Sequence, residues 1–189
     1  MSVMAQAVIP TGRPFTVADL EGMPDDGNRY ELIDGMLHVS PAPRWQHQLV
    51  LGELAFLLRA ACPRDLRVAF APLDVQVDER TSVQPDVLVT RFADFGERVL
   101  PVAPLLAVEI LSPSTRLYDL NTKKSAYEWM GVAAYWVVDS TDPGTLIVFE
   151  LVEGRYEQIA QVHGDEEFAA TSPFPVTVVP ARLLDGLRP

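Results

Sequence analysis

A single run of seven residues, Leu-Leu-Ala-Val-Glu-Ile-Leu at 105–111, limits the fold of this chain more than any other segment. The run is apolar on both faces apart from Glu109, which is the pattern of a central strand covered on both sides. Such a strand needs a packing layer above and below its sheet. We therefore expect a fold that carries the Glu109 carboxylate into the interior.

The segments around this strand supply the expected layers. Apolar residues in helical spacing predict a helix over 46–61, and a second helix is expected over 118–130, ended by Gly131. Strands are predicted at 67–70, 73–77, 86–90, 134–139, 146–152 and 156–162, with a short helix at 16–23 and a last element at 176–184. The fold class is therefore α/β (α+β) with a mixed central sheet.

A hairpin is predicted over residues 29–40. Asp34-Gly35 is a strong two-residue turn signal, and it places Ile33 opposite Met36. The same register pairs Leu32 with Leu37 and sets Glu31 against His38. The predicted register therefore fixes the strand face on which Glu31 lies.

Length and composition predict one domain and exclude several classes of protein. The 189 residues are 48% hydrophobic, enough for a substantial core, so we expect a single domain over 15–189 after a loosely ordered segment 1–14. One cysteine excludes an internal disulfide and suits a cytoplasmic location. The N-terminus lacks the basic region of a signal peptide, and no apolar run approaches the roughly 20 residues of a membrane span.

The charge and the metal-binding residue types narrow the function further. A net charge of −11 argues against broad, non-specific binding of nucleic acid, which depends on Lys and Arg. It does not exclude a substrate bridged by a metal, because a cluster of carboxylates is the preferred site of a hard divalent cation. One Cys and three well-separated His make a four-ligand structural zinc site unexpected.

Two acidic residues are candidates for such a cation site. An ionised Glu109 in an apolar strand is costly unless it is paired or bound to a metal; the alternatives are a nearby arginine or a solvated strand end. Asp86 follows Pro85 at the opening of a strand that should neighbour the Glu109 strand. Carboxylates from neighbouring strands can share one Mg²⁺, although Asp86 also fits an ordinary turn aspartate.

The two lysines of the chain are adjacent, Lys123 and Lys124, and all other basic residues are arginine. A lysine retained in such a chain suggests a compact ammonium beside a reacting water or phosphate, and surface solvation is the alternative. Asp119, Lys123 and Tyr127 recur at helical spacing and share a face, either as a surface pair or as a face turned to Glu109. Lys124 belongs to the neighbouring stripe.

An ordered set of motifs over residues 15–185 resembles a known family. It consists of Tyr30-Glu-Leu-Ile-Asp-Gly35, Gln84-Pro-Asp-Val87, Val108-Glu-Ile-Leu-Ser-Pro-Ser-Thr115, Asp119, Lys123, Tyr127, Gly131 and Tyr135-Trp-Val-Val-Asp139. This set resembles the Uma-two family of restriction endonuclease-like proteins, of the PD-(D/E)XK superfamily. The resemblance implies an αβββαβ core, to which the chain adds an N-terminal hairpin and C-terminal strands, and a metal-dependent phosphodiesterase activity.

The resemblance also implies a set of site residues. It makes Asp86 and Glu109 metal ligands, with the Ile110 carbonyl as a third ligand, and adds Glu31 to the site. The superfamily pattern places a lysine two residues after the second acidic residue, where this chain has Leu111. Lys123 matches the position to which the lysine has moved in similar proteins.

Two further residues are weaker candidates. His47 opens the helix expected at 46–61, either as a half-buried structural histidine or as part of the site. Glu53 on the same helix is an alternative to Glu31.

The sequence therefore predicts a Mg²⁺- or Mn²⁺-dependent endonuclease acting on DNA, without a membrane partner and assembled as a homodimer. Asp86 and Glu109 would hold the metal, and Lys123 would orient or help to deprotonate the attacking water, or stabilise the transition state. Glu31 would bind a second metal ion or position the first. The rival is a catalytically inactive protein that keeps the fold as a binding or regulatory module. The acidic net charge and the absence of a lysine at 111 favour the rival.

Overall fold

The strand that contains Glu109, β7 (Leu106–Leu111), lies inside a six-stranded sheet, and all six of its residues are buried. This is seen in a computed structural model of the chain, which describes residues 12–112 and 115–187. The strand order of this central sheet is β10-β9-β8-β7-β6-β3. The other strands are β3 (Leu66–Phe70), β6 (Val87–Arg91), β8 (Ala134–Asp139), β9 (Thr145–Val152) and β10 (Arg155–His163).

The central sheet is mixed, as the sequence predicted. β7 and β8 run parallel, with Glu109 opposite Val137, and the other neighbouring strands are antiparallel. A parallel pair needs a crossover connection, which is supplied by a π-helical turn, η2 (Tyr118–Lys123), and the helix α3 (Lys124–Met130). This connection begins just after the strand end that carries Glu109.

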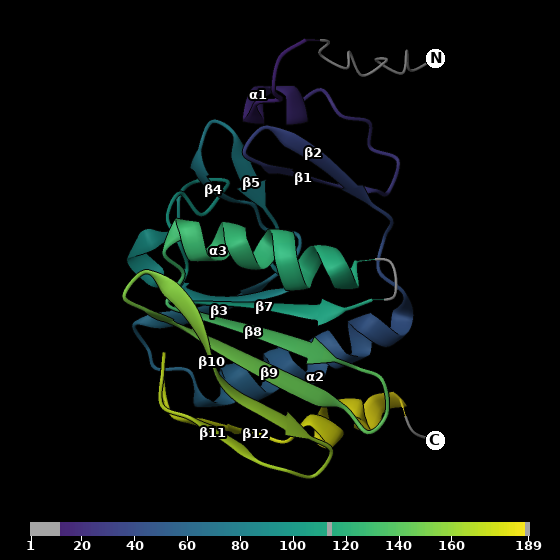
Figure 1. Cartoon of the computed structure of the whole chain (residues 1–189), viewed down its shortest axis with the longest axis vertical. Helices are drawn as coiled ribbons and strands as arrows, with labels where there is room; N and C mark the ends of the chain where they lie inside the picture. Colours follow the sequence, from purple (N-terminus) through teal and green to yellow (C-terminus); the bar gives the residue numbers. More distant parts are fainter. Residues whose placement is uncertain (1–11, 113–114, 188–189) are drawn as a thin grey trace.

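Two different layers cover the faces of the central sheet (Figure 1). On one face, α2 (Trp45–Ala61) buries Val50, Leu54 and Leu58 in a wholly apolar cluster with Val108 and Ile110 of β7. On the other face, Ala107 and Leu111 of β7 pack in a second cluster with Tyr127 of α3. Glu109 alternates with Val108 and Ile110 and shares the face of Ala107 and Leu111, so it faces α3 rather than α2.

A smaller sheet of order β2-β1-β5-β4 lies beyond α3 (Figure 1). It contains β1 (Arg29–Ile33), β2 (Met36–Ser40), β4 (Val75–Asp78) and β5 (Thr81–Val83), and the short helix α1 (Val17–Leu20) precedes it. The predicted hairpin register is confirmed, with Glu31 paired to His38. The strand β5 was not predicted, and it joins the hairpin to β4.

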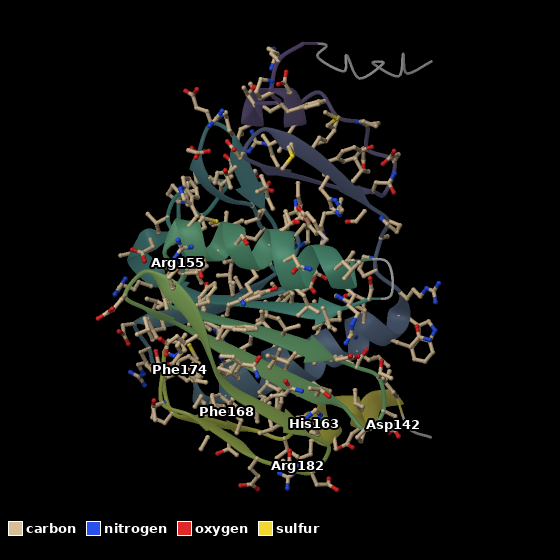
Figure 2. All side chains as sticks on the ribbon, viewed as in Figure 1. Asp142, Arg155, His163, Phe168, Phe174 and Arg182 are labelled. Atoms are coloured by element: carbon tan, nitrogen blue, oxygen red, sulfur yellow. The ribbon has the colours of Figure 1, made fainter. Side chains whose placement is uncertain are left out.

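The C-terminal part of the chain closes the α2 side of the central sheet. It forms a two-stranded sheet of β11 (Phe168–Ala170) and β12 (Val176–Val178), followed by the 3₁₀ segment η3 (Pro180–Leu187). Figure 2 places Phe168 and Phe174 in this region; Phe168 meets Trp136 edge to face at 5.8 Å, and Phe174 is buried in the apolar cluster. These aromatic contacts complete the core beneath the sheet.

Two expectations concern parts of the chain that the structure tests only in part. Most of the segment 1–14, predicted to be loosely ordered, lies outside the described residues, and a single domain over 15–189 stays a prediction. Within the described part of the chain, no helix has the length and apolarity needed to cross a membrane.

Candidate active site

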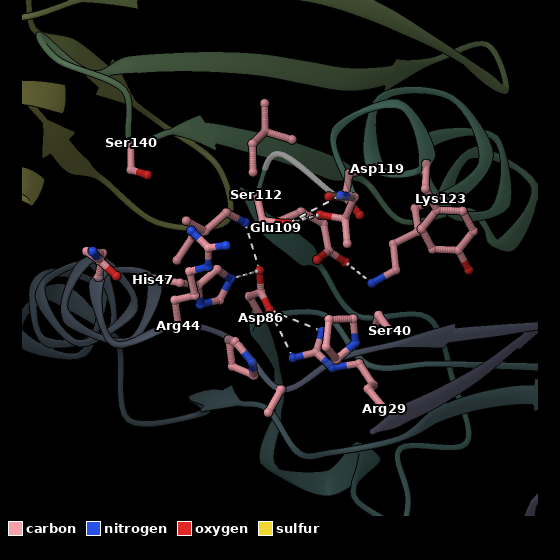
Figure 3. Close-up of a pocket in the computed structure, with 18 of the residues that line it drawn as sticks. Arg29, Ser40, Arg44, His47, Asp86, Glu109, Ser112, Asp119, Lys123 and Ser140 are labelled. Atoms are coloured by element: carbon pink, nitrogen blue, oxygen red, sulfur yellow. Dashed lines mark hydrogen bonds and ion pairs between the residues drawn. The ribbon is translucent and has the colours of Figure 1, made fainter. Parts of the chain in front are cut away.

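The predicted acidic residues and Lys123 line one cavity of about 430 Å³ (Figure 3). Its walls come from the hairpin, the start of α2, the ends of β6 and β7, and η2. Four acidic side chains line the cavity, namely Glu31, Asp86, Glu109 and Asp119. Three cationic side chains, Arg29, Arg44 and Lys123, line it as well, together with His47. Charges that are far apart in the sequence are therefore concentrated in one place on an acidic protein.

Asp86 reaches the cavity from the residue just before β6. Because β6 and β7 are antiparallel, with Val87 opposite Val108, Asp86 lies beside the end of β7. The Ile110 N–H donates a hydrogen bond to Asp86 Oδ2 at 2.8 Å. The Ile110 carbonyl faces the same edge, because the N–H and C=O of one residue in an extended strand point the same way.

Two cationic or potentially cationic side chains face Asp86, which is 2% exposed. Arg29 donates from both terminal nitrogens to Oδ1 at 3.2 Å, and His47 Nε2 lies 2.9 Å from Oδ2 (Figure 3). Burial opposes ionisation of Asp86, but the hydrogen bond and charge of His47 and the charges of Arg29 and Lys123 outweigh it. Together they lower the pKa of Asp86 to about 2. Asp86 is therefore a well-compensated carboxylate.

Glu109 is also 2% exposed but has fewer donors. Lys123 Nζ donates to Glu109 Oε1 at 2.8 Å, and the Tyr127 hydroxyl donates to the same oxygen at 2.6 Å. Burial raises the pKa of Glu109 well above its usual range; Lys123 opposes this rise, and the charges of Asp86, Asp119 and Glu31 add to it. Glu109 is paired with a lysine rather than with the arginine considered from the sequence.

Lys123 joins two carboxylates from different sheets. Its ammonium lies 2.8 Å from Glu109 on β7 and 2.9 Å from Glu31 on β1, and all three side chains are 2% exposed. Burial lowers the pKa of Lys123, but its acidic neighbours, with Glu109 and Glu31 foremost, outweigh burial and raise the pKa above its usual value. Lys123 is therefore an ammonium throughout the physiological pH range.

The local structure at Lys123 is a π-helical turn rather than the continuous α-helix predicted over 118–130. π-helical turns are rare and occur frequently at functional sites. The predicted face of Asp119, Lys123 and Tyr127 is nevertheless buried toward the sheet. The alternative of a solvated surface pair between Asp119 and Lys123 is therefore wrong.

Of the two weaker candidates, His47 and Glu53, only His47 lines the cavity. His47 lines the cavity and contacts Asp86, whereas Glu53 is exposed on α2 and its Oε1 lies near Gly186 of η3. Glu53 therefore does not replace Glu31. The second lysine, Lys124, places its ammonium 4.1 Å from the centre of the Phe149 ring and does not line the cavity.

Arg29, Arg44 and Tyr118 line the cavity and were not identified from the sequence. Arg29 lies two residues before Glu31 on β1, and this spacing places both on one strand face, so the period of the strand was the available signal. Tyr118 opens η2, stacks on His38 at 3.6 Å between ring centres, and has a buried hydroxyl without a hydrogen-bond partner among the described residues. No local pattern marks Tyr118.

Comparison with known proteins identifies the family. The model of the Uma2 family, described as "Putative restriction endonuclease", matches residues 17–182. A solved structure described as a putative nuclease belonging to DUF820, from Anabaena variabilis, is similar in fold, with a TM-score of 0.68 and 19% identity, and the match covers 85% of this chain and 90% of that one. No curated protein matches the chain. The chain belongs to the Uma2 family and has a restriction endonuclease-like fold.

Proposed function

We propose that this protein is a metal-dependent nuclease of PD-(D/E)XK type that hydrolyses phosphodiester bonds of DNA. The observation that carries the proposal is the position of the Lys123 ammonium, 2.8 Å from the Glu109 carboxylate in a cavity that also contains Asp86. The description of the Uma2 family and that of the similar structure support a nuclease.

The chemistry of the donor atoms fits a hard divalent cation such as Mg²⁺ or Mn²⁺. Asp86 and Glu109 would hold the ion together with the Ile110 carbonyl, which faces the Asp86 edge of β7. Within residues 12–112 and 115–187, no three His, Cys, Asp or Glu side chains are grouped so as to hold a metal ion by themselves. Backbone oxygen and water would therefore complete the set of ligands. When bound, such an ion lowers the pKa of a coordinated water and offsets charge on the phosphate.

The raised pKa of Lys123 supports one of the roles considered for it. A side chain that stays protonated cannot accept a proton from water, so Lys123 acts as a hydrogen-bond donor and as a positive charge near the scissile phosphate. Glu31 holds the ammonium from the opposite side at 2.9 Å. The Gln84 N–H fixes Glu31 in turn, at 2.7 Å from its Oε1.

The composition of the cavity wall favours the enzyme over an inactive binding module. A binding module with no metal would leave a uniformly acidic rim, whereas Arg29, Arg44 and Lys123 stand among the carboxylates here, and Arg44 is exposed. The lysine missing at Leu111 is replaced in space by Lys123. Leu111 and Glu109 lie on the same strand face, so a side chain from η2 reaches the place that residue 111 would have reached.

The test is a nuclease assay on the purified protein with Mg²⁺ or Mn²⁺ and labelled duplex, single-stranded and branched DNA. We expect cleavage that needs the ion and is lost in Glu109→Ala, with Glu53→Ala as a matched control on an exposed glutamate outside the cavity. Metal-dependent cleavage that persists at the wild-type rate in Glu109→Ala would show a contaminating nuclease or a different site.

We also propose that the protein forms a homodimer in solution. The central sheet ends at β10 and β3, and the smaller sheet ends at β2 and β4, so each sheet leaves strand edges that need cover. A two-fold axis would also match the symmetry of a DNA duplex. Light scattering at micromolar concentration should give twice the 20.9 kDa mass of one chain; a particle of 20.9 kDa would reject the dimer.

A further inference from the structure

A second cavity, with a volume of about 960 Å³, adjoins the candidate active site. It is lined chiefly by residues of the segments that lead into β1 and β4, and we call it the Asp74 groove after one of them. Arg29, Ala42 and Pro43 line both cavities, so the groove begins where the active site ends. Its volume is within the range of sites that bind small organic groups.

The charges of the Asp74 groove do not suit a run of phosphates. Its charged lining residues are three acidic and two basic ones, namely Glu21, Asp25, Asp74, Arg29 and Arg98. Arg29 is already engaged in an ion pair within the active site. Because binding of a nucleic-acid backbone depends on cationic side chains, the groove fits a neutral group that donates hydrogen bonds better than it fits phosphate.

Asp74 supplies the acceptor for such a group. Its Oδ1 accepts hydrogen bonds from Ser82 Oγ at 3.3 Å and from Gln84 Nε2 at 3.0 Å, whereas Oδ2 accepts none from the described residues. Gln84 is itself fixed to the active site, because its N–H donates to Glu31 and its carbonyl accepts from Arg29. The carboxylate is therefore held in place at one oxygen and is available to a ligand at the other.

The position of the groove matches that of a neighbouring nucleotide. A nucleic-acid strand whose phosphate lies in the active site must continue beyond it, and the two cavities meet at Arg29. Enzymes that take a base out of the stack read its Watson–Crick edge in a pocket. Building on the proposed function, we propose that the Asp74 groove binds the unstacked base next to the scissile phosphate and that Asp74 makes this site selective for guanine.

The preference for guanine follows from the donors of each base. An ionised carboxylate only accepts hydrogen bonds. Guanine has two adjacent donors on its Watson–Crick edge, N1–H and the N2 amino group, whereas each of the other bases has one. Asp74 Oδ2 has two lone pairs to receive them, since the hydrogen bonds from Ser82 and Gln84 are both on Oδ1.

The experiment titrates the full chain with the 5′-monophosphates of guanosine, inosine, adenosine and cytidine and follows ¹⁵N chemical shifts. These probes contain no phosphodiester bond, so binding is measured apart from cleavage. The guanosine nucleotide should shift the backbone amides of Asp74, Gln76 and Gln84. It should bind about 10-fold more tightly than the inosine nucleotide, which lacks the N2 amino group, because a good pair of hydrogen bonds to a base discriminates on this scale.

Asp74→Asn tests the role of Oδ2 with little change elsewhere. The asparagine oxygen can still accept from Ser82 and Gln84, but an amide N–H₂, which donates, replaces Oδ2. We expect this variant to lose the 10-fold preference for guanosine over inosine. Asp78→Asn is the matched control, because it removes the same charge from an exposed residue of β4 outside the groove and should keep the preference.

Equal affinity for the guanosine and inosine nucleotides, or an unchanged preference in Asp74→Asn, would overturn the inference. So would millimolar guanosine nucleotide that leaves the amides of the groove unshifted. If the protein nevertheless cleaves DNA with a divalent metal, the proposed function stands without the guanine site. Selective guanosine binding in the groove by a protein that cleaves no DNA would support the guanine site and reject the proposed function.

Discussion

Asp86 and Glu109 are two buried carboxylates on adjacent strands, and their surroundings shift their pKa values in opposite directions. Arg29, His47 and the Ile110 N–H face Asp86, and His47, Arg29 and the charge of Lys123 lower its pKa to about 2 despite burial. Glu109 accepts two hydrogen bonds on one oxygen, and burial raises its pKa well above the usual value. Equal exposure thus gives opposite proton affinities, and the number of cations facing each group decides the sign.

The difference follows from how the positive charges are divided. The guanidinium of Arg29 makes its ion pair with Asp86, whereas the Lys123 ammonium is shared between Glu109 and Glu31. The charge of Asp86 is therefore balanced by a cationic side chain of the protein, whereas the half of the cavity around Glu109 has more negative than positive charge. An added cation would stabilise the Glu109 half most, which is why the proposed metal belongs between the two carboxylates rather than on Asp86 alone.

Removal of Lys123 should produce the largest effect, because it leaves two buried carboxylates without their shared partner. We expect Lys123→Ala to reduce the nuclease rate by about 10²–10³-fold, the range for loss of one donor that stabilises charge in the transition state. Loss of one partner of a buried ion pair also costs about 3–5 kcal/mol of stability. Steady-state kinetics and urea unfolding measure the two effects separately.

Lys123→Arg is the informative companion variant. It keeps the positive charge but places a larger, planar group where Lys123 is 2% exposed, so it should not restore the rate. A fully active Lys123→Arg would show that any cation at this point suffices. If Lys123→Ala neither slows cleavage nor lowers stability, the pairing of Lys123 with Glu109 is irrelevant to both.

Neutral substitutions of the two carboxylates should have unequal effects on stability. In Asp86→Asn the new amide N–H₂ meets either the Arg29 guanidinium or the Ile110 N–H, both of which already donate, so we expect a loss of about 3–5 kcal/mol at pH 7. In Glu109→Gln the amide oxygen can still accept from Lys123 and Tyr127, and the cost of burying a charge disappears. We therefore expect a loss of less than about 2 kcal/mol, the scale of one or two hydrogen bonds.

The pH dependence of these effects has a definite sign. Because the folded pKa of Asp86 is lowered, its contribution to stability is present above its unfolded pKa of 3.8 and is lost as pH falls toward about 2. Glu109 has a raised pKa, so it costs stability as pH rises above its unfolded value of 4.5. Equal losses in the two variants at pH 7 would contradict the contrast between the two halves of the cavity.

Sequence reasoning succeeded where local patterns determine the structure. The Asp34-Gly35 turn fixes the hairpin register, and with it the face on which Glu31 lies. The apolar run at 105–111 identified the buried strand β7, and helical spacing placed Lys123 on the face turned to Glu109. Each of these depends on residues that are close in the sequence.

Contacts between distant segments could not be predicted in the same way. Arg29 and His47 meet Asp86 across 57 and 39 positions of the chain, and their pairing depends on how the smaller sheet and α2 pack on the central sheet. The strand β5 has three residues and was too short to give a period, and the helix predicted at 16–23 is limited to Val17–Leu20. The π-helical turn at Lys123 also has no signal in residue spacing.

A smaller effect is expected at Asp119, which extends the negative charge of the Glu109 half. Burial, with added repulsion from Asp86 and Glu31, raises the pKa of Asp119 to about 6, although Lys123 and Thr115 oppose the rise. A raised pKa means that wild type loses stability as pH rises from about 4 to 6. Asp119→Asn should remove this dependence, so that relative to wild type it gains about 2 kcal/mol between pH 4 and pH 7. Urea unfolding at both pH values measures the gain, and parallel curves for the two proteins would refute the assignment.

The smallest effect should come from substitution of Lys124. This residue is also a lysine but lies outside the cavity, so it tests whether position or residue type matters. Lys124 is one residue from Lys123, but its ammonium lies over the Phe149 ring at 4.1 Å, outside the cavity. A partly exposed cation–π contact is worth about 0.5–1 kcal/mol, so Lys124→Ala should lose no more than that in stability and should keep the wild-type nuclease rate and metal affinity. Cleavage rates of Lys123→Ala and Lys124→Ala, purified in parallel, would compare the two lysines directly. A slow Lys124→Ala beside an active Lys123→Ala would place the functional ammonium one residue further along the helix, and Glu109 would then be paired with a lysine that has no part in the reaction.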